Sequence, residues 1–177
     1  MPEDQSINGD IWTEEANHLL KKIGWEKIAD SNIDVPGTDG YMHGIDSIFT
    51  FFDGFRPNKE QAVFLEAKRY LTSSFNGSKF NDWIRVIDLK IRSLKDSQDF
   101  FDRYPSLESC NVRNALLVVW FHDFENYPQF REKIDKALMN VKLPGTRGGS
   151  KTNKLFVLTN DGICKLASIV KSVSDWN

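Results

Sequence analysis

The sequence has little cysteine and almost no net charge. The first feature argues against disulfide-rich and zinc-binding proteins, and the second argues against a generally basic protein. Only Cys110 and Cys164 carry thiols, with neither CxxC spacing nor a histidine cluster beside them. This argues against a disulfide framework and against a zinc site, and we expect both thiols to be buried and unreactive. The net charge of −2 gives no general basic character. Any contact with a polyanion would therefore come from a local patch.

Long apolar runs are also absent. No window is long and apolar enough to span a bilayer, and residues 1–10 are polar and acidic, unlike a signal peptide. We therefore expect a soluble, cytoplasmic protein that makes no membrane contact. The chain has 177 residues, of which 40% are hydrophobic, and it contains no internal repeat or linker. These features predict a single domain covering residues 1–177.

The spacing of apolar residues predicts alternating helices and strands. Helices are predicted at residues 11–24, 79–94, 127–140 and 162–173, the second with a possible extension to residue 104. Strands are predicted at residues 25–29, 44–52, 62–70, 114–123 and 154–160, with 30–40 as a loop. This order, αβββαβαβα, indicates an α/β fold with a mixed central sheet flanked by helices.

One predicted strand, "AVFLEAKRY" at residues 62–70, carries an unexpected pair of charges. Because side chains alternate along a strand, Phe64, Glu66 and Lys68 share one face. Two interpretations are open: a solvated edge strand or a catalytic site. A second triplet of this kind, Asp88-Leu89-Lys90, lies on a predicted helix, where residues two apart diverge. We interpret that triplet as surface charge.

The preceding strand favours the catalytic interpretation because it carries Asp46, and the connection "DGFRPNKEQ" makes an antiparallel hairpin of the two strands. Carboxylates from adjacent strands, with the Ala67 carbonyl beside them, offer the hard oxygen ligands that Mg²⁺ or Mn²⁺ prefers. The ammonium group of Lys68 could orient a water molecule and stabilise a phosphoryl transition state. Glu15 falls on the apolar face of the first helix, where a buried carboxylate would need a cation or a donor.

These residues and the order of elements resemble the PD-(D/E)XK nuclease superfamily, whose restriction-endonuclease-like core is αβββαβ. The resemblance covers about residues 10–123 and leaves a C-terminal α/β extension. It matches Glu15, or alternatively Glu14, to the acid of the first helix, Asp46 to the second-strand acid, and Glu66 with Lys68 to the E-x-K motif. Gly44-Ile45 stands where the family often has proline. A glutamine-containing helix motif is missing, and Lys90 or Arg92 is expected to replace it as a phosphate contact.

The resemblance implies a metal-dependent DNA endonuclease of phage defence, restriction or DNA repair and recombination, with RNA left open as a substrate. Asp46, Glu66 and the Ala67 carbonyl would hold Mg²⁺ or Mn²⁺, Lys68 would position water, and Glu15 would be an auxiliary acid. The expected nucleic-acid contacts are Arg69, Lys79, Lys90, Arg147 and Lys151. Chains of this size imply a homodimer or a partner subunit. The alternative is an inactive scaffold subunit with the same fold.

A glycine-rich stretch, "GTRGGSKT" at residues 145–152, is close to a phosphate-binding loop but does not qualify as one. Ser150 replaces a required glycine, and the stretch leads from a helix into a strand instead of the reverse. We expect a surface loop. Its Arg147 and Lys151 either touch a nucleic-acid backbone or are simply solvated. His43, near Asp46, either faces the site or is a plain surface residue.

Overall fold

The computed structural model describes residues 7–54, 59–123, 127–141 and 153–174 and contains the predicted mixed sheet. Its five strands lie in the order β1-β4-β5-β6-β7. β4 pairs antiparallel with β1 and with β5, whereas β5, β6 and β7 run parallel. The strands are β1 (Glu26–Lys27), β4 (Ser47–Phe51), β5 (Gln61–Tyr70), β6 (Asn111–Phe121) and β7 (Lys154–Leu158). β5 is thus an inner strand as far as Leu65, and beyond that residue its charged end pairs with β6 alone.

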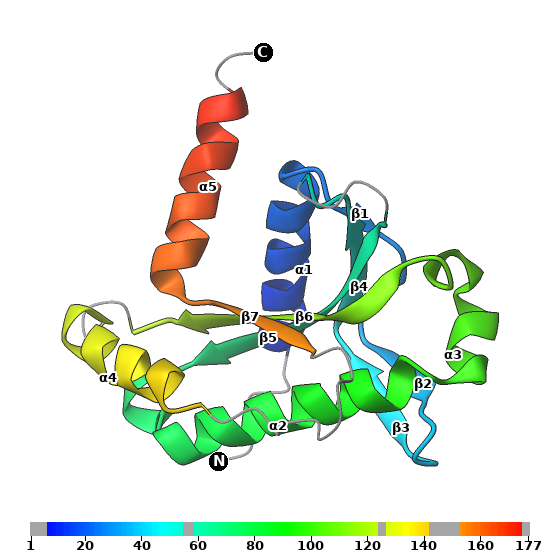
Figure 1. The fold of residues 1–177 in the computed structure, drawn as a ribbon. Coiled ribbons are helices and arrows are strands. Elements are labelled where there is room, and N and C mark those ends of the chain that lie inside the picture. The colour runs from blue at the N-terminus through cyan, green and yellow to red at the C-terminus, as the bar shows by residue number, and fades with distance from the viewer. Residues whose placement is uncertain (1–6, 55–58, 124–126, 142–152, 175–177) are drawn as a thin grey trace.

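Helices cover both faces of this sheet (Figure 1). On one face lie α1 (Ile7–Lys22) and α5 (Asn160–Ser174), and on the other lie α2 (Gly77–Leu94) and α4 (Tyr127–Met139). The short helix α3 (Gln98–Arg103) and the single turns η1 (Thr72–Ser74) and η2 (Pro105–Leu107) complete the connections. The predicted α/β architecture is therefore confirmed.

The alternation of side chains along β5 divides the core into two parts. Val63 and Leu65 pack with Ala16 and Leu20 of α1, whereas Phe64 packs on the side that α2 covers. Because the alternation continues through the charged end of the strand, Glu66 and Lys68 point toward α2. Glu66 and Lys68 therefore continue, on the same face of β5, a row of side chains that begins with Phe64 in the hydrophobic core.

The segment predicted as a loop at residues 30–40 contains a strand, so that prediction was wrong. β2 (Ile33–Pro36) pairs antiparallel with β3 (Met42–Ile45) in a separate two-stranded sheet. Ile33 and Val35 are both buried on one face of β2. This alternation of apolar residues predicts a strand, but the proline and glycine that follow it led us to expect a loop. The predicted strand at 44–52 is correspondingly divided, with Asp46 between β3 and β4.

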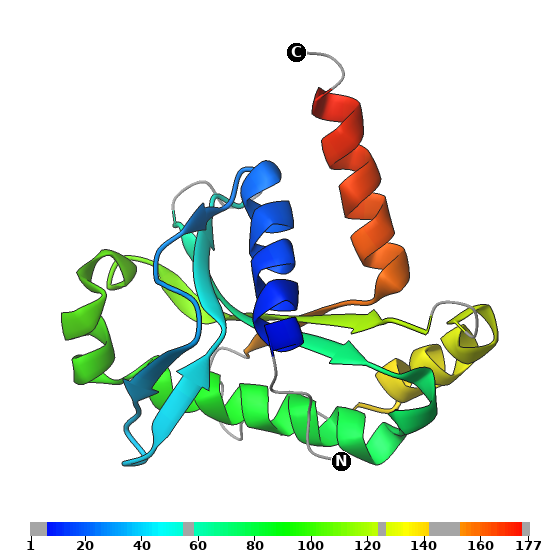
Figure 2. The same cartoon turned by 180° about the vertical axis from the view of Figure 1, so that it is seen from behind.

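The thiols differ in environment: Cys110 is buried, as expected, but Cys164 is exposed on α5. Figure 2 shows that α5 stands away from the body beyond its N-terminal end. Ile163 in its first turn is buried, but Ile169 remains 55% exposed. Among the described residues, no helix is both long enough and apolar enough to cross a membrane.

The position of Leu117 in the inner strand β6 generates a test of the fold. Its side chain is fully buried, so Leu117→Ala should lower the free energy of unfolding by about 2–5 kcal/mol. Leu89→Ala on the exposed side of α2 is the matched control and should change it by less than about 0.5 kcal/mol. Urea denaturation followed by circular dichroism measures both. Equal effects of the two substitutions would contradict the described core.

Candidate active site

The candidate site lies where β4 and β5 separate. The described ladder between these strands ends with Ser47 opposite Leu65. Continuing that antiparallel register places Asp46 opposite Glu66, and opposite residues of an antiparallel pair present their side chains on the same face. The local register therefore explains why two acids 20 residues apart in the sequence meet.

Asp46 is held in place by the backbone of β5. Its Oδ2 accepts a hydrogen bond from the Ala67 N–H at 2.7 Å. The N–H and C=O groups of one strand residue point to the same side of the strand, so the Ala67 carbonyl also turns toward the side of Asp46. We call the place where β4 and β5 separate, with Asp46, Glu66 and Ala67, the corner of the sheet. Its oxygen donors are thus two carboxylates and one backbone carbonyl.

Glu66 is paired with two lysines from different elements. Its Oε1 lies 3.4 Å from the Nζ of Lys68, and its Oε2 lies 2.7 Å from the Nζ of Lys90 on α2. The three side chains are only 12%, 19% and 14% exposed, respectively. Glu66 and Lys68 are therefore not a solvated surface pair.

The interpretation of Asp88 and Lys90 as surface charge was wrong. Lys90 reaches Glu66, and Asp88 is buried and accepts hydrogen bonds from Arg92 Nε at 2.7 Å and Asn153 Nδ2 at 2.9 Å. The two side chains point in different directions, as residues two apart on a helix must. Both nevertheless point into the protein and not toward solvent. Lys90 follows the buried Ile87 by three residues, so its place beside the apolar stripe was a usable signal.

Burial and the neighbouring negative charge of Glu66 raise the pKa of Asp46 to about 6. The Ala67 N–H and the positive charges of Lys68 and Lys90 act in the opposite direction. Two carboxylates that resist joint ionisation favour a cation between them, and their oxygens with the Ala67 carbonyl suit a hard divalent ion. Within the described ranges no group of three His, Cys, Asp or Glu side chains could hold a metal. The backbone carbonyl would therefore complete the donor set.

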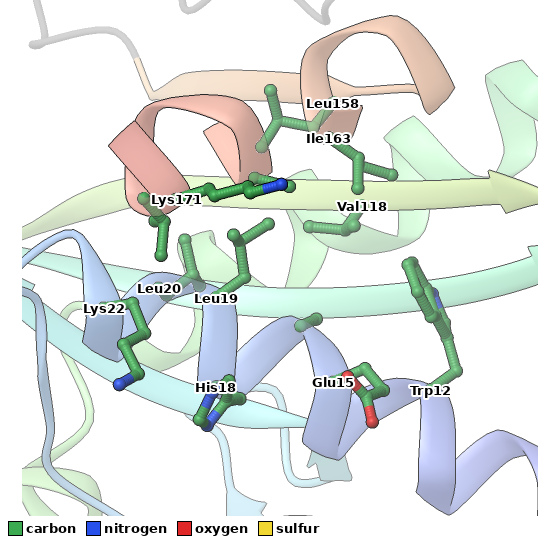
Figure 3. Close-up of a pocket in the computed structure, with 13 residues that line it drawn as sticks. Trp12, Glu15, His18, Leu19, Leu20, Lys22, Val118, Leu158, Ile163 and Lys171 are labelled. Carbon is green, nitrogen blue, oxygen red and sulfur yellow. The ribbon is translucent and has the colours of Figure 1, made fainter. Parts of the chain in front are cut away.

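Glu15 does not share this corner. Figure 3 shows it on α1, among residues that line a groove of about 330 Å³ between α1 and α5. Val118 also lines this groove, so the groove lies on the sheet face opposite to Glu66. The expected burial of Glu15 was wrong, because its side chain is exposed and needs no compensating cation.

Glu14, the alternative acid of the first helix, belongs to a separate polar cluster. It accepts hydrogen bonds from Ser31 Oγ and from Asn17 Nδ2, and Lys27 Nζ lies 3.7 Å away. The Ser31 hydrogen bond is the main cause of its lowered pKa. Asn32, which follows Ser31 in the sequence, donates its N–H to the backbone carbonyl of Asp46. The cluster is thereby joined to the backbone of the candidate site.

The other predicted residues have varied surroundings. Arg69 is exposed at the end of β5, and the Nζ of Lys79 lies 4.5 Å from the centre of the Tyr70 ring. Arg147 and Lys151, with the whole glycine-rich stretch 145–152, lie outside the described residues. His43 Nε2 lies 3.0 Å from Asp39, and this hydrogen bond helps lower the pKa of Asp39 to about 2. His43 therefore already has a carboxylate partner.

The raised pKa of Asp46 predicts that Asp46→Asn stabilises the metal-free protein above neutral pH. The folded protein holds this proton more tightly than the unfolded chain, so wild-type stability falls as pH rises from about 4 to 6. The variant avoids that loss and can still accept the Ala67 N–H. Its advantage should grow from near zero at pH 4 to about 2–3 kcal/mol above pH 7.

Urea denaturation in the presence of EDTA measures this difference across pH. Asp82→Asn, on the exposed side of α2, is the control and should change stability by less than about 0.5 kcal/mol throughout. An Asp46→Asn protein that is less stable than wild type at pH 7.5 would contradict the described environment.

Comparison with known proteins identifies the family of the chain. The family model described as the GAPS4 protein PD-(D/E)XK nuclease domain matches residues 1–162. Protein Ycf2 A and Protein Ycf2 B of Crucihimalaya wallichii are 23% identical over 101 residues, covering 57% of this chain but only 4% of each relative. No solved structure matches. Because the family model covers most of the chain, the protein belongs to the PD-(D/E)XK nuclease superfamily, as a member of the GAPS4 nuclease-domain family.

Proposed function

We propose that the protein is a metal-dependent endonuclease that hydrolyses phosphodiester bonds in DNA, with Asp46, Glu66 and Lys68 as its catalytic residues. The observation that carries this proposal is the meeting of two poorly hydrated carboxylates, a backbone carbonyl and two ammonium groups at one corner of the sheet. Membership of a nuclease-domain family supports the reaction class.

The donor set fits Mg²⁺ or Mn²⁺. Asp46, Glu66 and the Ala67 carbonyl offer oxygen atoms only, and burial together with the charge of Glu66 raises the pKa of Asp46, which a bound cation would offset. A bound divalent ion would supply an activated water molecule and neutralise charge on the phosphodiester. The Ala67 N–H fixes the orientation of Asp46, so one ligand needs little rearrangement.

Lys68 has the position expected of a group that serves the reacting phosphate. Its ammonium lies 3.4 Å from Glu66 and is only partly exposed, so its charge is weakly screened by water. We assign to it two tasks: positioning the attacking water and stabilising the negative charge that develops on the phosphoryl oxygens. The exposed Glu15, on the other face of the sheet, has no part in this proposed centre.

Binding of the nucleic acid would rest on local positive charge, because the chain as a whole carries −2. Arg69, Lys79 and Lys90 belong to the part of the fold that holds the site, and Arg147 and Lys151 are further proposed phosphate contacts. Such contacts position the backbone but do not read its sequence. We therefore propose that a homodimer or a partner subunit selects the target. The family description favours a role in phage defence.

An inactive scaffold is the second candidate, and one observation favours it. Each oxygen of Glu66 already has an ammonium partner, so this acid is neutralised without any metal. A scaffold of this kind would keep the charged cluster for stability alone.

Cleavage of supercoiled plasmid distinguishes the two candidates. With Mg²⁺ or Mn²⁺ the wild-type protein should nick the plasmid, and Lys68→Ala and Asp46→Ala should each lower the rate at least about 100-fold, because the first removes the ammonium at the reacting phosphate and the second removes a ligand of the ion. Lys136→Ala, an exposed lysine of α4, is the control and should nick at the wild-type rate. EDTA should abolish nicking.

The scaffold candidate predicts a different pattern. The wild-type protein would then shift the plasmid in a gel without nicking it, or Lys68→Ala and Asp46→Ala would behave like wild type in every assay. Either pattern contradicts the endonuclease proposal.

A further inference from the structure

Lys90 forms the tightest ion pair of the site, although it lies outside the E-x-K motif. Its Nζ is 2.7 Å from Glu66 Oε2, compared with 3.4 Å from Lys68 Nζ to Oε1. Both members of the Lys90–Glu66 pair are less than 15% exposed. A pair of this kind gains more from its charges than a surface pair does, and separating it leaves both charges poorly solvated.

The formal charges of the corner balance without any ion. Asp46 and Glu66 contribute two negative charges when ionised, and Lys68 and Lys90 contribute two positive charges. A divalent ion added to this set would leave a net charge of +2 in a site of low hydration, and it would compete with Lys90 for the same Glu66 oxygen. Lys90 therefore pairs with a Glu66 oxygen that the ion would also need.

We propose that Lys90 is a positioning residue that keeps Glu66 in an ion pair until a phosphate group binds, so that the divalent ion and the nucleic acid bind cooperatively. This inference rests on the proposed metal-dependent nuclease function. A phosphate group would accept a hydrogen bond from the Lys90 ammonium and offset the excess positive charge. Glu66 would then be available to bind the ion. Because coupling between two ligands is reciprocal, the ion would strengthen phosphate binding by the same factor.

Lys90 and Lys68 approach Glu66 from different elements. Lys90 reaches it from α2 through a long side chain, whereas Lys68 lies on β5, the strand that carries Glu66. A small rotation of the Lys90 side chain would break its ion pair without disturbing the sheet. The exchange therefore requires no movement of the backbone.

Titration of Mn²⁺ tests this proposal without relying on activity. Calorimetry with the metal alone should show weak binding to wild type and at least about tenfold tighter binding to Lys90→Met, which keeps the side-chain length but removes the competing charge. Lys90→Arg keeps the charge and should resemble wild type. Lys27→Met is the matched control, because Lys27 is similarly covered, at 16% exposure, and pairs with Glu14. It should not change the affinity.

A second set of titrations contains a short DNA duplex with non-hydrolysable phosphorothioate linkages. The duplex should tighten Mn²⁺ binding to wild type at least about tenfold and should have a smaller effect on Lys90→Met. Thermal unfolding of each variant checks that the fold is retained. If Lys90→Met fails to fold, Lys90→Gln takes its place with the same expected result.

Two outcomes would overturn the proposal, and they are distinguishable. Equal Mn²⁺ affinity of wild type and Lys90→Met, with no effect of the duplex, would refute the role of Lys90 while leaving the metal centre intact. Failure of every protein to bind Mn²⁺, with or without the duplex, would refute the metal centre and the inference together.

Discussion

The burial of Asp46 beside the second carboxylate, Glu66, is the constraint on which the proposed function depends. The two acids meet one step beyond the last pair of the β4–β5 ladder, in a position with little access to water. Their charges require cations, and the fold supplies two lysines. A structure built only for stability would gain more from apolar residues at these positions. The retained charges therefore favour a chemical role.

The rest of the fold keeps this corner rigid. The backbone that carries Glu66 and Lys68 lies beyond the β4–β5 ladder but remains paired with β6, which holds it in the sheet. The turn of the small hairpin is tied to the end of α2, where Ser93 Oγ donates to Asp39. Because β3 leads directly into Asp46, this contact also limits movement of the first acid. α2 contributes to the site twice, by anchoring the hairpin and by presenting Lys90.

Local patterns predicted much of this arrangement. The alternation in β5 placed Glu66 and Lys68 on one face, and the expected hairpin brought Asp46 to them, because both features depend on residues close in sequence. Lys90 was assigned to the surface because its partner lies 24 residues away and is set by how α2 crosses the sheet. Glu15 was expected to be buried because the helical pattern alone could not show that α1 and α5 leave a groove between them, which Glu15 lines. Both errors concern the packing of whole elements.

The most direct measurement of the central claim is the anomalous diffraction of crystals soaked in Mn²⁺ together with a short non-hydrolysable DNA duplex. The account predicts one strong peak bonded to oxygen atoms of both Asp46 and Glu66, with Lys90 turned from Glu66 toward a phosphate. A peak that touches only one of the carboxylates, or an unchanged Lys90–Glu66 ion pair with no ion beside it, would contradict the account.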